Sequence, residues 1–285
     1  MKERQRQNNF DRTFVRTVRT YFRKHGRHDL PWRTLPQSLS ANERAYRILV
    51  SEIMLQQTQV PRVREKYRAF LRAFPSVRAL AGAPLGDVLR AWQGLGYNRR
   101  AKLLHRCAQV IADTHRNAFP NTFEVLILLP GVGPYTAGAI MAFAYNEPVV
   151  MIETNIRTVY LFHYFDGKTD VSDKEVLAHV ARTSDLRNPR EWYAALMDYG
   201  TFLKQTYGSH NARSRHYTRQ SAFKGSDREI RGAIMRTLAQ NGPHTTQKLI
   251  KELSSFDGVR IKEQLFKLFA EGLVTKTGHR YTLPS

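Results

Sequence analysis

Apolar residues recur at spacings of three and four through roughly the first 220 residues, and this periodicity predicts a mostly helical chain. Glycine and proline residues such as Pro31, Gly94 and Pro130 separate the periodic segments, as expected where helices end. No sustained alternation of apolar and polar residues indicates a strand in this region. The predicted helices cover residues 9–24, 46–57, 61–73, 84–93, 101–114, 123–128, 135–145, 155–162, 174–183 and 191–204.

The helical pattern ends at residues 207–225, which are basic and contain few aliphatic side chains. Arg213, Arg215 and Arg219 all lie in this segment. We interpret it as a basic linker or a loop that follows the surface. The chain is therefore expected to divide into a helical domain over residues 1–206, this linker, and a further domain over residues 226–285.

The last sixty residues have a different organisation. Ser226 and Glu229 have the spacing of a capping box at the start of an amphipathic run that reaches Gln240. Two more short helices are predicted at 245–253 and 257–271, followed by a hairpin at 273–283. Three helices and a hairpin predict a small winged-helix-like α+β domain. Such a domain can place a helix in a DNA groove or dock another protein, and both possibilities stay open.

Net charge narrows the choice of partner. The chain has 45 Lys and Arg residues against 24 Asp and Glu residues, a formal charge of +21. A charge this large favours a protein that binds a polyanion such as nucleic acid over a soluble protein that simply has a basic face. Its one cysteine, Cys107, is expected to be buried and excludes a disulfide framework. No segment reaches the ~18 apolar residues of a membrane span, and no signal peptide is evident. We therefore expect a cytoplasmic, nucleoid-associated protein that does not bind membranes.

A glycine-rich turn gives the first functional signal. Gly131, Val132 and Gly133 precede a predicted helix that includes Thr136. Glycine permits positive φ and close approach of another backbone, and the first N–H groups of a helix have no partner within it. The turn is therefore a candidate phosphate-binding site.

Two glutamates are candidate catalytic groups. Glu52 lies in an apolar helical segment, so it is either an ordinary surface side chain or a buried carboxyl group able to act as a general acid. Glu153 precedes a helix, where either it or Asn155 could be the N-cap, or Glu153 could face a cationic substrate. Two carboxylates suffice to hydrolyse a glycosidic bond. Gln56 and Gln57 carry amides that can contact base edges.

The motifs occur in the order found in one family. Glu52 with Leu-Gln-Gln-Thr-Gln, Gly-Leu-Gly-Tyr at 94–97, the turn at 129–137, Glu153-x-Asn155 and Met-Asp-x-Gly at 197–200 resemble the helix-hairpin-helix base-excision DNA glycosylases, in particular the MutY-like adenine glycosylases. Leu-Pro-Trp-Arg at 30–33 is also similar. The resemblance covers roughly residues 10–205. It implies a helix-hairpin-helix fold of two helical subdomains with the active site between them.

The resemblance also implies roles for individual residues. Glu52 matches the general acid that protonates the departing base, and Asn155 matches an asparagine that orients the water and the sugar-side carboxylate. Tyr135 matches a position that is lysine in members with lyase activity, which implies base removal without efficient strand cleavage. Gln56, Gln57 and Tyr97 match residues that wedge into the base stack or contact the bases, although Tyr97 could instead be a core aromatic residue.

The sequence departs from the family at the catalytic loop. The sugar-side carboxylate of the family is an aspartate, and Glu153 stands in its place, one methylene longer. A displacement of about 1 Å at a catalytic group can cost about 10²-fold in rate. Thr154 stands where the MutY proteins usually have glycine. These changes leave either a compensated or an altered activity open.

A second departure concerns the cofactor. Most members bind a [4Fe–4S] cluster through four cysteines, and the matching positions here are Lys204, Asn211, Ser214 and Gln220. Thiolates hold such clusters, so we expect no cluster, no other metal and no cofactor. The basic segment, through Arg213, Arg215 and Arg219, is a candidate to take over the DNA-facing role of the cluster loop.

These expectations define a monofunctional DNA glycosylase of base excision repair, acting as a monomer on double-stranded DNA that carries a mismatch or lesion. The expected substrate is adenine opposite 8-oxoguanine or guanine. A thymine or uracil mismatch glycosylase, and a non-catalytic DNA-binding protein derived from a glycosylase, are the alternatives. Typical MutY proteins end in a Nudix-like domain that recognises 8-oxoguanine, and the winged-helix-like segment stands in its place here, so recognition of the opposite base is the implication of the resemblance that transfers least.

Overall fold

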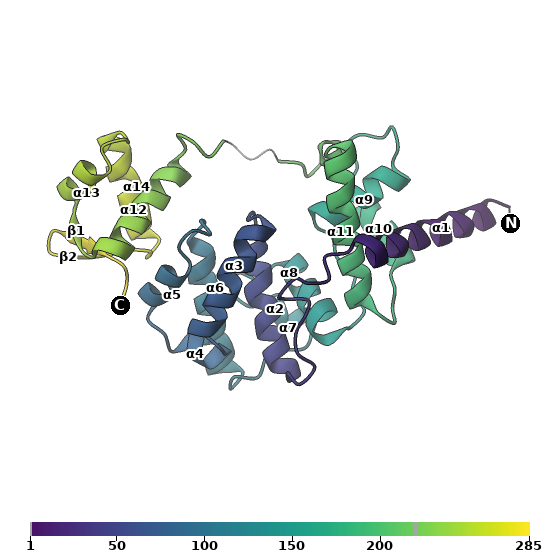
Figure 1. The fold of residues 1–285 in the computed structure, drawn as a ribbon, viewed down its shortest axis with the longest axis horizontal. Helices are drawn as coiled ribbons and strands as arrows, with labels where there is room; N and C mark the ends of the chain where they lie inside the picture. Colours follow the sequence, from purple (N-terminus) through teal and green to yellow (C-terminus); the bar gives the residue numbers. More distant parts are fainter. Residues whose placement is uncertain (1, 219–221) are drawn as a thin grey trace. The chain divides into compact units, whose positions relative to one another are not determined.

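The computed structural model describes residues 2–218 and 222–285, in which the chain forms two compact, mostly helical units (Figure 1). Each unit is assembled from separate stretches of sequence. The first, unit 1, contains residues 1–48, 121–128 and 132–219, and unit 2 contains residues 49–120, 129–131 and 220–285. None of the helices described is both long enough and apolar enough to cross a membrane.

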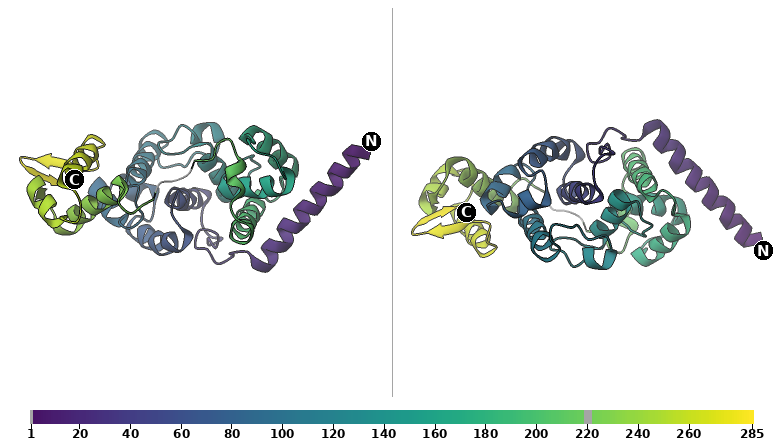
Figure 2. Two further views of the ribbon diagram at one scale, coloured as in Figure 1. Left: turned by 90° about the horizontal axis from the view of Figure 1, so that it is seen from above. Right: turned by 90° about the horizontal axis from the view of Figure 1, so that it is seen from below.

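Unit 1 is built around a cluster of aromatic side chains. Phe14 of the N-terminal helix packs edge-on against Trp192 and Tyr164, with ring centroids 6.1 and 5.1 Å away. Helices α9, α10 and α11 lie beside one another around this cluster (Figures 1 and 2). The elements of unit 1 are α1 (Lys2–His25), the start of α2 (Ala41–Leu55), α7 (Phe123–Leu126), α8 (Pro134–Ile140), the π-helix η1 (Met141–Tyr145), α9 (Thr154–Tyr164), α10 (Asp173–Thr183), α11 (Pro189–Tyr207) and the 3₁₀ helix η2 (His210–Arg213).

Unit 2 joins a helical bundle to the C-terminal segment. Its core contains Phe70, Trp92 and Leu104, all essentially inaccessible to solvent. The elements are the end of α2, α3 (Val60–Ala73), α4 (Val77–Ala81), α5 (Leu85–Ala91), α6 (Arg99–Thr114), α12 (Asp227–Asn241), β1 (His244–Thr245), α13 (Thr246–Glu252), α14 (Gly258–Ala270), β2 (Thr275–Thr277) and β3 (Arg280–Thr282).

All the helices predicted from periodicity are present, with differences at their ends. The N-terminal helix begins at Lys2 rather than residue 9. The prediction began too late because the first turns are polar and have no apolar periodicity. The segment predicted as one helix over 135–145 changes from α-helix to π-helix at Met141. The short helix α4 was not predicted; Ser76 caps it by accepting a hydrogen bond from the Ala79 N–H.

The C-terminal segment has the predicted three helices and hairpin, with β1 added to make a three-stranded antiparallel sheet in the order β1-β3-β2. The predicted capping box at Ser226 is wrong. The Ser226 hydroxyl donates to the Phe223 carbonyl, and Glu229 accepts from the Gly225 N–H instead of the Ser226 N–H. The segment before the helix turns back on itself, and this geometry redirects both side chains.

The C-terminal segment is docked tightly within unit 2. A Cβ at Gly86 of α5 would lie 2.2 Å from the Pro284 carbonyl oxygen, so only glycine fits there. Lys102 of α6 donates to the Glu271 carbonyl at 2.5 Å, next to Gly272. The described residues of the predicted linker include η2, and Ser214 bridges to Val171. The predicted domain boundaries stay a prediction.

One buried carboxylate fixes the start of the chain to α11. Asp198, 3% exposed, accepts from the Arg27 side chain at 2.5 and 2.7 Å, from the Arg27 N–H, and from both terminal nitrogens of Arg33 at 2.7 and 3.0 Å. Burial raises the pKa of Asp198, but its hydrogen bonds and the two guanidinium charges together lower the pKa by more than burial raises it. The pKa of Asp198 is therefore below its ordinary value of 3.8. Two of the motifs found in the sequence thus meet in space.

We expect Asp198→Asn to lower the free energy of unfolding by about 3 kcal/mol, because it leaves two guanidinium groups without their carboxylate. Because the folded pKa is depressed, the stabilisation is present above the ordinary pKa of 3.8 and is lost as pH falls through the folded value. Urea unfolding of both proteins between neutral and acidic pH checks this. A difference that stays constant down to acidic pH would contradict the charge-based account.

Candidate active site and DNA-facing loops

Glu52 is buried in the last turn of α2, in unit 2. Its exposed fraction is 5%, and Ser51, Ile53 and Met54 around it in sequence are buried as well. The interpretation as an ordinary surface glutamate is therefore wrong. Burial on an apolar helix, away from bulk water, is the kind of environment in which a carboxyl group can act as a general acid.

The glycine turn joins α7 to α8 as a helix-hairpin-helix. Gly131 has φ +79°, and a Cβ there would come within 2.9 Å of the Leu103 Cβ, so glycine is needed for both conformation and space. Gly133 has φ −92° and open space around it, so of the two glycines only Gly131 uses the freedom that glycine gives. Val132 and Thr136 are buried. The phosphate-binding role of the turn stays a prediction.

Glu153 is the N-cap of α9, in unit 1. Its Oε1 accepts from the backbone N–H groups of Asn155 and Ile156 at 2.7 and 2.8 Å, and its Oε2 accepts from the Asn155 Nδ2 at 3.1 Å. Of the two cap candidates, Glu153 is therefore the one used. Its carboxylate is held at the positive end of the helix dipole, and the same bonds fix the Asn155 amide.

Helix α11 supplies the surface against which this loop packs. A Cβ at Gly200 would lie 2.3 Å from the Asn155 carbonyl oxygen and 2.9 Å from the Asn155 Cβ. The Asn155 backbone, in the first turn of α9, thus packs directly on Gly200; below, the catalytic loop means Glu153 and this first turn. Two contacts explain the Met-Asp-x-Gly motif. Asp198 binds Arg27 and Arg33 near the N-terminus, and Gly200 leaves room for the Asn155 backbone.

Polar contacts occupy the positions where the family has cluster cysteines. The Asn211 side chain is 4% exposed and donates from Nδ2 to the Thr154 carbonyl at 3.2 Å, so it braces the same loop from η2. Burial lowers the pKa of Lys204, and the charge of Glu153 opposes that shift. Ser214 is buried beside Val171. Gln220 lies outside the described residues.

The basic segment is ion-paired at two of its three predicted DNA-facing arginines. Arg215 forms a bidentate pair with Asp170, at 2.7 Å from its Nη2, and Arg213 lies 3.8 Å from Asp166. These are exposed pairs, which contribute little stability and leave the arginines accessible. Arg219 lies outside the described residues. Their role in DNA binding stays a prediction.

The predicted wedge residues lie on two tight turns of unit 2. Gln57 and Tyr97 both have left-handed backbones, with φ +54° and +47°, a conformation uncommon for residues with side chains. Tyr97 is partly exposed, so the interpretation as a core aromatic residue is wrong. Gln56 is half-buried and Gln57 exposed.

A buried arginine that the sequence did not single out joins these two turns. Arg100 donates to the carbonyls of Ile53 and Met54 at 2.8 and 3.0 Å and to that of Gln56, at the C-terminal end of α2. It also donates to the carbonyls of Leu95 and Gly96 at 3.0 and 3.2 Å. Burial lowers its pKa to about 10. An Arg at the start of an unremarkable helix carries no sequence signal for this role.

The same turns line a pocket of about 470 Å³ that α12 helps to enclose. Arg228 donates to the Tyr97 hydroxyl at 2.6 Å, and its guanidinium lies 5.7 Å from the ring centroid. Arg231 pairs with Glu271 at 2.6 Å on the same side. Gln56, Gln57 and Tyr97 are therefore brought together, and the C-terminal segment contributes arginines to their surroundings.

The structure thus assembles two groups of predicted residues. Glu153, Asn155 and Tyr135 belong to unit 1, while Glu52, Gln56, Gln57 and Tyr97 belong to unit 2. Among the residues described, no cluster of histidine, cysteine, aspartate or glutamate side chains has the arrangement of a metal site. A buried carboxyl group in unit 2, and an anchored carboxylate with a fixed amide in unit 1, are the kinds of group that hydrolysis of a glycosidic bond uses.

Comparison with known proteins agrees with this assignment. Residues 50–185 match the HhH-GPD superfamily of base excision DNA repair proteins. An adenine DNA glycosylase of Mycobacterium tuberculosis is 34% identical over 285 residues, covering 93% of this chain and 91% of that protein, and one from Mycolicibacterium smegmatis is 34% identical over 271 residues. The chain belongs to the HhH-GPD superfamily. The match to the Mycobacterium tuberculosis protein extends beyond residues 10–205, the range over which the sequence motifs resemble the family.

Solved structures show the same fold. A thermostable thymine-DNA glycosylase superposes with a TM-score of 0.60 at 25% identity, covering 68% of this chain and 87% of that one. An endonuclease III–DNA complex superposes with a TM-score of 0.51 at 16% identity. The predicted family and the predicted mostly helical glycosylase fold are therefore confirmed.

We expect Gly200→Ala to reduce the rate of base removal by about 10²-fold or more, because the added methyl group must displace the Asn155 backbone. Gly232→Ala is the matched control, since it also lies within a helix but has open space around it, and its activity should be unchanged. Single-turnover kinetics, with circular dichroism to check folding, measure the effect. Equal rates in both variants would show that the contact does not position the loop.

Proposed function

We propose that this protein is a monofunctional DNA glycosylase that removes adenine mispaired with 8-oxoguanine or guanine in double-stranded DNA. The observation that carries the proposal is the burial of Glu52 on α2, within the segment that matches the family. The similarity to adenine DNA glycosylases over 93% of the chain supports adenine as the base.

The reaction needs one acid that protonates the departing base and one carboxylate that stabilises the positive charge on the sugar. Glu52 protonates the departing adenine, which makes the base a better leaving group. As the N-glycosidic bond breaks, positive charge develops on the sugar, and the Glu153 carboxylate stabilises it in a site that excludes water. Asn155, whose amide is fixed by Glu153, orients the attacking water. The target nucleotide must first leave the base stack.

The longer side chain of Glu153 is compatible with this role. Its Oε1 is used by two backbone N–H groups, while Oε2 accepts one bond from Asn155 and keeps a further lone pair for the substrate. The cap interaction thus sets the carboxylate position through the start of α9. Gly200 and Asn211 contact the backbone of Asn155 and Thr154, the two residues that follow Glu153.

The finer features of the activity follow from individual side chains. Tyr135 offers no amine to attack the sugar, so the enzyme hydrolyses the bond without efficient strand cleavage. The pocket around Tyr97 and Arg228 contacts bases of the mispair. The protein acts as a monomer. Removal of thymine or uracil opposite guanine is the second candidate, which the likeness to a thymine-DNA glycosylase favours.

Incubation with duplexes carrying A:8-oxoG, A:G, T:G and U:G pairs tests the proposal. We expect alkali-sensitive sites only in the two adenine duplexes, no strand breaks before alkali, and no covalent adduct on borohydride treatment. Glu52→Gln should lower the rate by at least about 10³-fold, since the acid is removed without changing its shape. Glu65→Gln, at an exposed position of α3, is the control. Cleavage only in the T:G and U:G duplexes would favour the second candidate.

We also propose that the loop is held without an iron–sulfur cluster. Iron analysis of the purified protein should give no iron, because the chain has one cysteine and it is buried on α6. Asn211→Ala should then reduce base removal by about 10-fold while retaining DNA binding, since the Thr154 carbonyl loses its hydrogen bond from η2 and keeps the one from the Thr158 hydroxyl of its own helix. Stoichiometric iron, or full activity in the variant, would contradict this account.

A further inference from the structure

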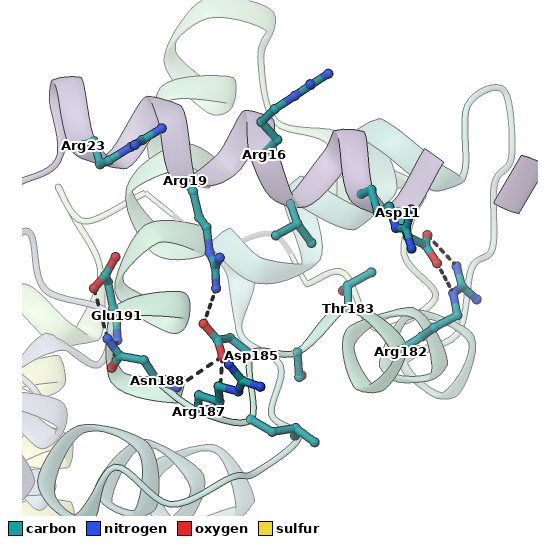
Figure 3. Close-up of a pocket in the computed structure, with 14 residues that line it drawn as sticks. Asp11, Arg16, Arg19, Arg23, Arg182, Thr183, Asp185, Arg187, Asn188 and Glu191 are labelled. Atoms are coloured by element: carbon teal, nitrogen blue, oxygen red, sulfur yellow. Dashed lines mark hydrogen bonds and ion pairs between the residues drawn. The ribbon is translucent and has the colours of Figure 1, made fainter. Parts of the chain in front are cut away.

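A second basic feature lies in unit 1, apart from the residues already described. The face of α1 and the segment from Arg182 to Glu191 enclose an open groove of about 940 Å³ (Figure 3). Three carboxylates and six guanidinium groups line it, so its formal charge is +3. The six arginines are Arg12, Arg16, Arg19, Arg23, Arg182 and Arg187.

Helix α1 is amphipathic in an unusual way, because its solvent face is an arginine stripe. Phe14, Val18 and Phe22 are buried at a spacing of four residues. The exposed arginines at 12, 16, 19 and 23 follow one another at spacings of four, three and four, which places them along one side of the helix. At 1.5 Å per residue the stripe is about 16 Å long, roughly the length of five base pairs along a DNA strand.

The acidic side chains of the groove are already engaged. Asp185 pairs with Arg19 and accepts from the backbone N–H groups of Arg187 and Asn188 at 3.0 and 3.2 Å (Figure 3). Asp11 accepts from Arg182 at 2.6 Å. These pairs tie α1 to the opposite wall and hold the groove open, rather than neutralising all of its cations.

Three arginines of the stripe keep their guanidinium groups for another partner. In the described part of the chain Arg12, Arg16 and Arg23 make no ion pair with a carboxylate, and Arg23 donates one hydrogen bond, from Nη2 to the Thr20 hydroxyl at 3.3 Å. Arg16 extends outward from the helix in Figure 3. A guanidinium presents a planar fork of donors that matches the oxygens of a phosphate. A row of such groups matches a regularly spaced polyanion better than a single small anion.

We propose that this arginine groove binds the phosphodiester backbone of a DNA segment outside the mispaired site, independently of sequence. The choice of DNA as the polyanion rests on the proposed function. The contacts contribute to affinity and to the search along the duplex, and they take no part in bond cleavage.

The test is a triple variant, Arg12→Gln, Arg16→Gln and Arg23→Gln, which leaves both ion pairs of the groove intact. Its affinity for an undamaged duplex of about 30 base pairs should fall on the order of 10-fold at low salt, and the slope of log K against log salt should decrease by about 2 to 3. The single-turnover rate at saturating enzyme should equal that of the unmodified protein. The matched control replaces the exposed arginines Arg72, Arg78 and Arg106 of unit 2 by glutamine.

An unchanged salt slope, or an equal loss in the control variant, would overturn the proposal in favour of a general charge effect. Polyglutamate that competes as well as duplex DNA at equal charge would point instead to an acidic protein partner and would also overturn it. If the unmodified protein removes no base from any duplex, the proposed function fails, whereas the salt slope still reports whether the groove binds DNA.

Discussion

The absence of a side chain at Gly200 is the constraint on which the candidate site depends. The first turn of α9, which follows the N-cap Glu153 and contains Asn155, packs on α11 at this point, so close that a single methyl group would overlap the Asn155 carbonyl. Two residues earlier, Asp198 ties the same helix to Arg27 and Arg33 near the start of the chain. One short stretch of helix therefore fixes both the N-terminal segment and the loop, and the position of the Glu153 carboxylate follows from it.

Most of the secondary structure could be predicted from the sequence, since amphipathic helices leave a periodic signal. The site was predictable only in part. Glu52 sits on an apolar helix in the sequence, but whether it is exposed or buried depends on packing by segments far away, and only the structure shows its 5% exposure. Arg100 was missed because its partners are backbone carbonyls. Every residue has a backbone carbonyl, so no residue type in the sequence marks such a partner. The Ser226 cap was wrong for a related reason: its geometry depends on how the chain enters the helix.

The cysteine positions show how one local requirement can be met by different chemistry. In this chain a buried amide, Asn211, reaches the Thr154 carbonyl, and Lys204 is half-buried near Glu153. Both act on the loop that the longer Glu153 side chain caps. Glu153, Thr154, Lys204 and Asn211 therefore lie together in unit 1, where the amide and the ammonium group face the start of α9.

The docking of the C-terminal segment has a consequence for how the protein can be divided. With Pro284 against Gly86 and Glu271 bound by Lys102, the final sixty residues cover faces of α5 and α6. They also supply the arginine that holds the Tyr97 hydroxyl. The segment is a structural part of the bundle rather than a detachable module. Deleting it would uncover the bundle and loosen the turn that holds Tyr97 at once, and exchanging it for the equivalent region of a relative would require matching substitutions on both helices.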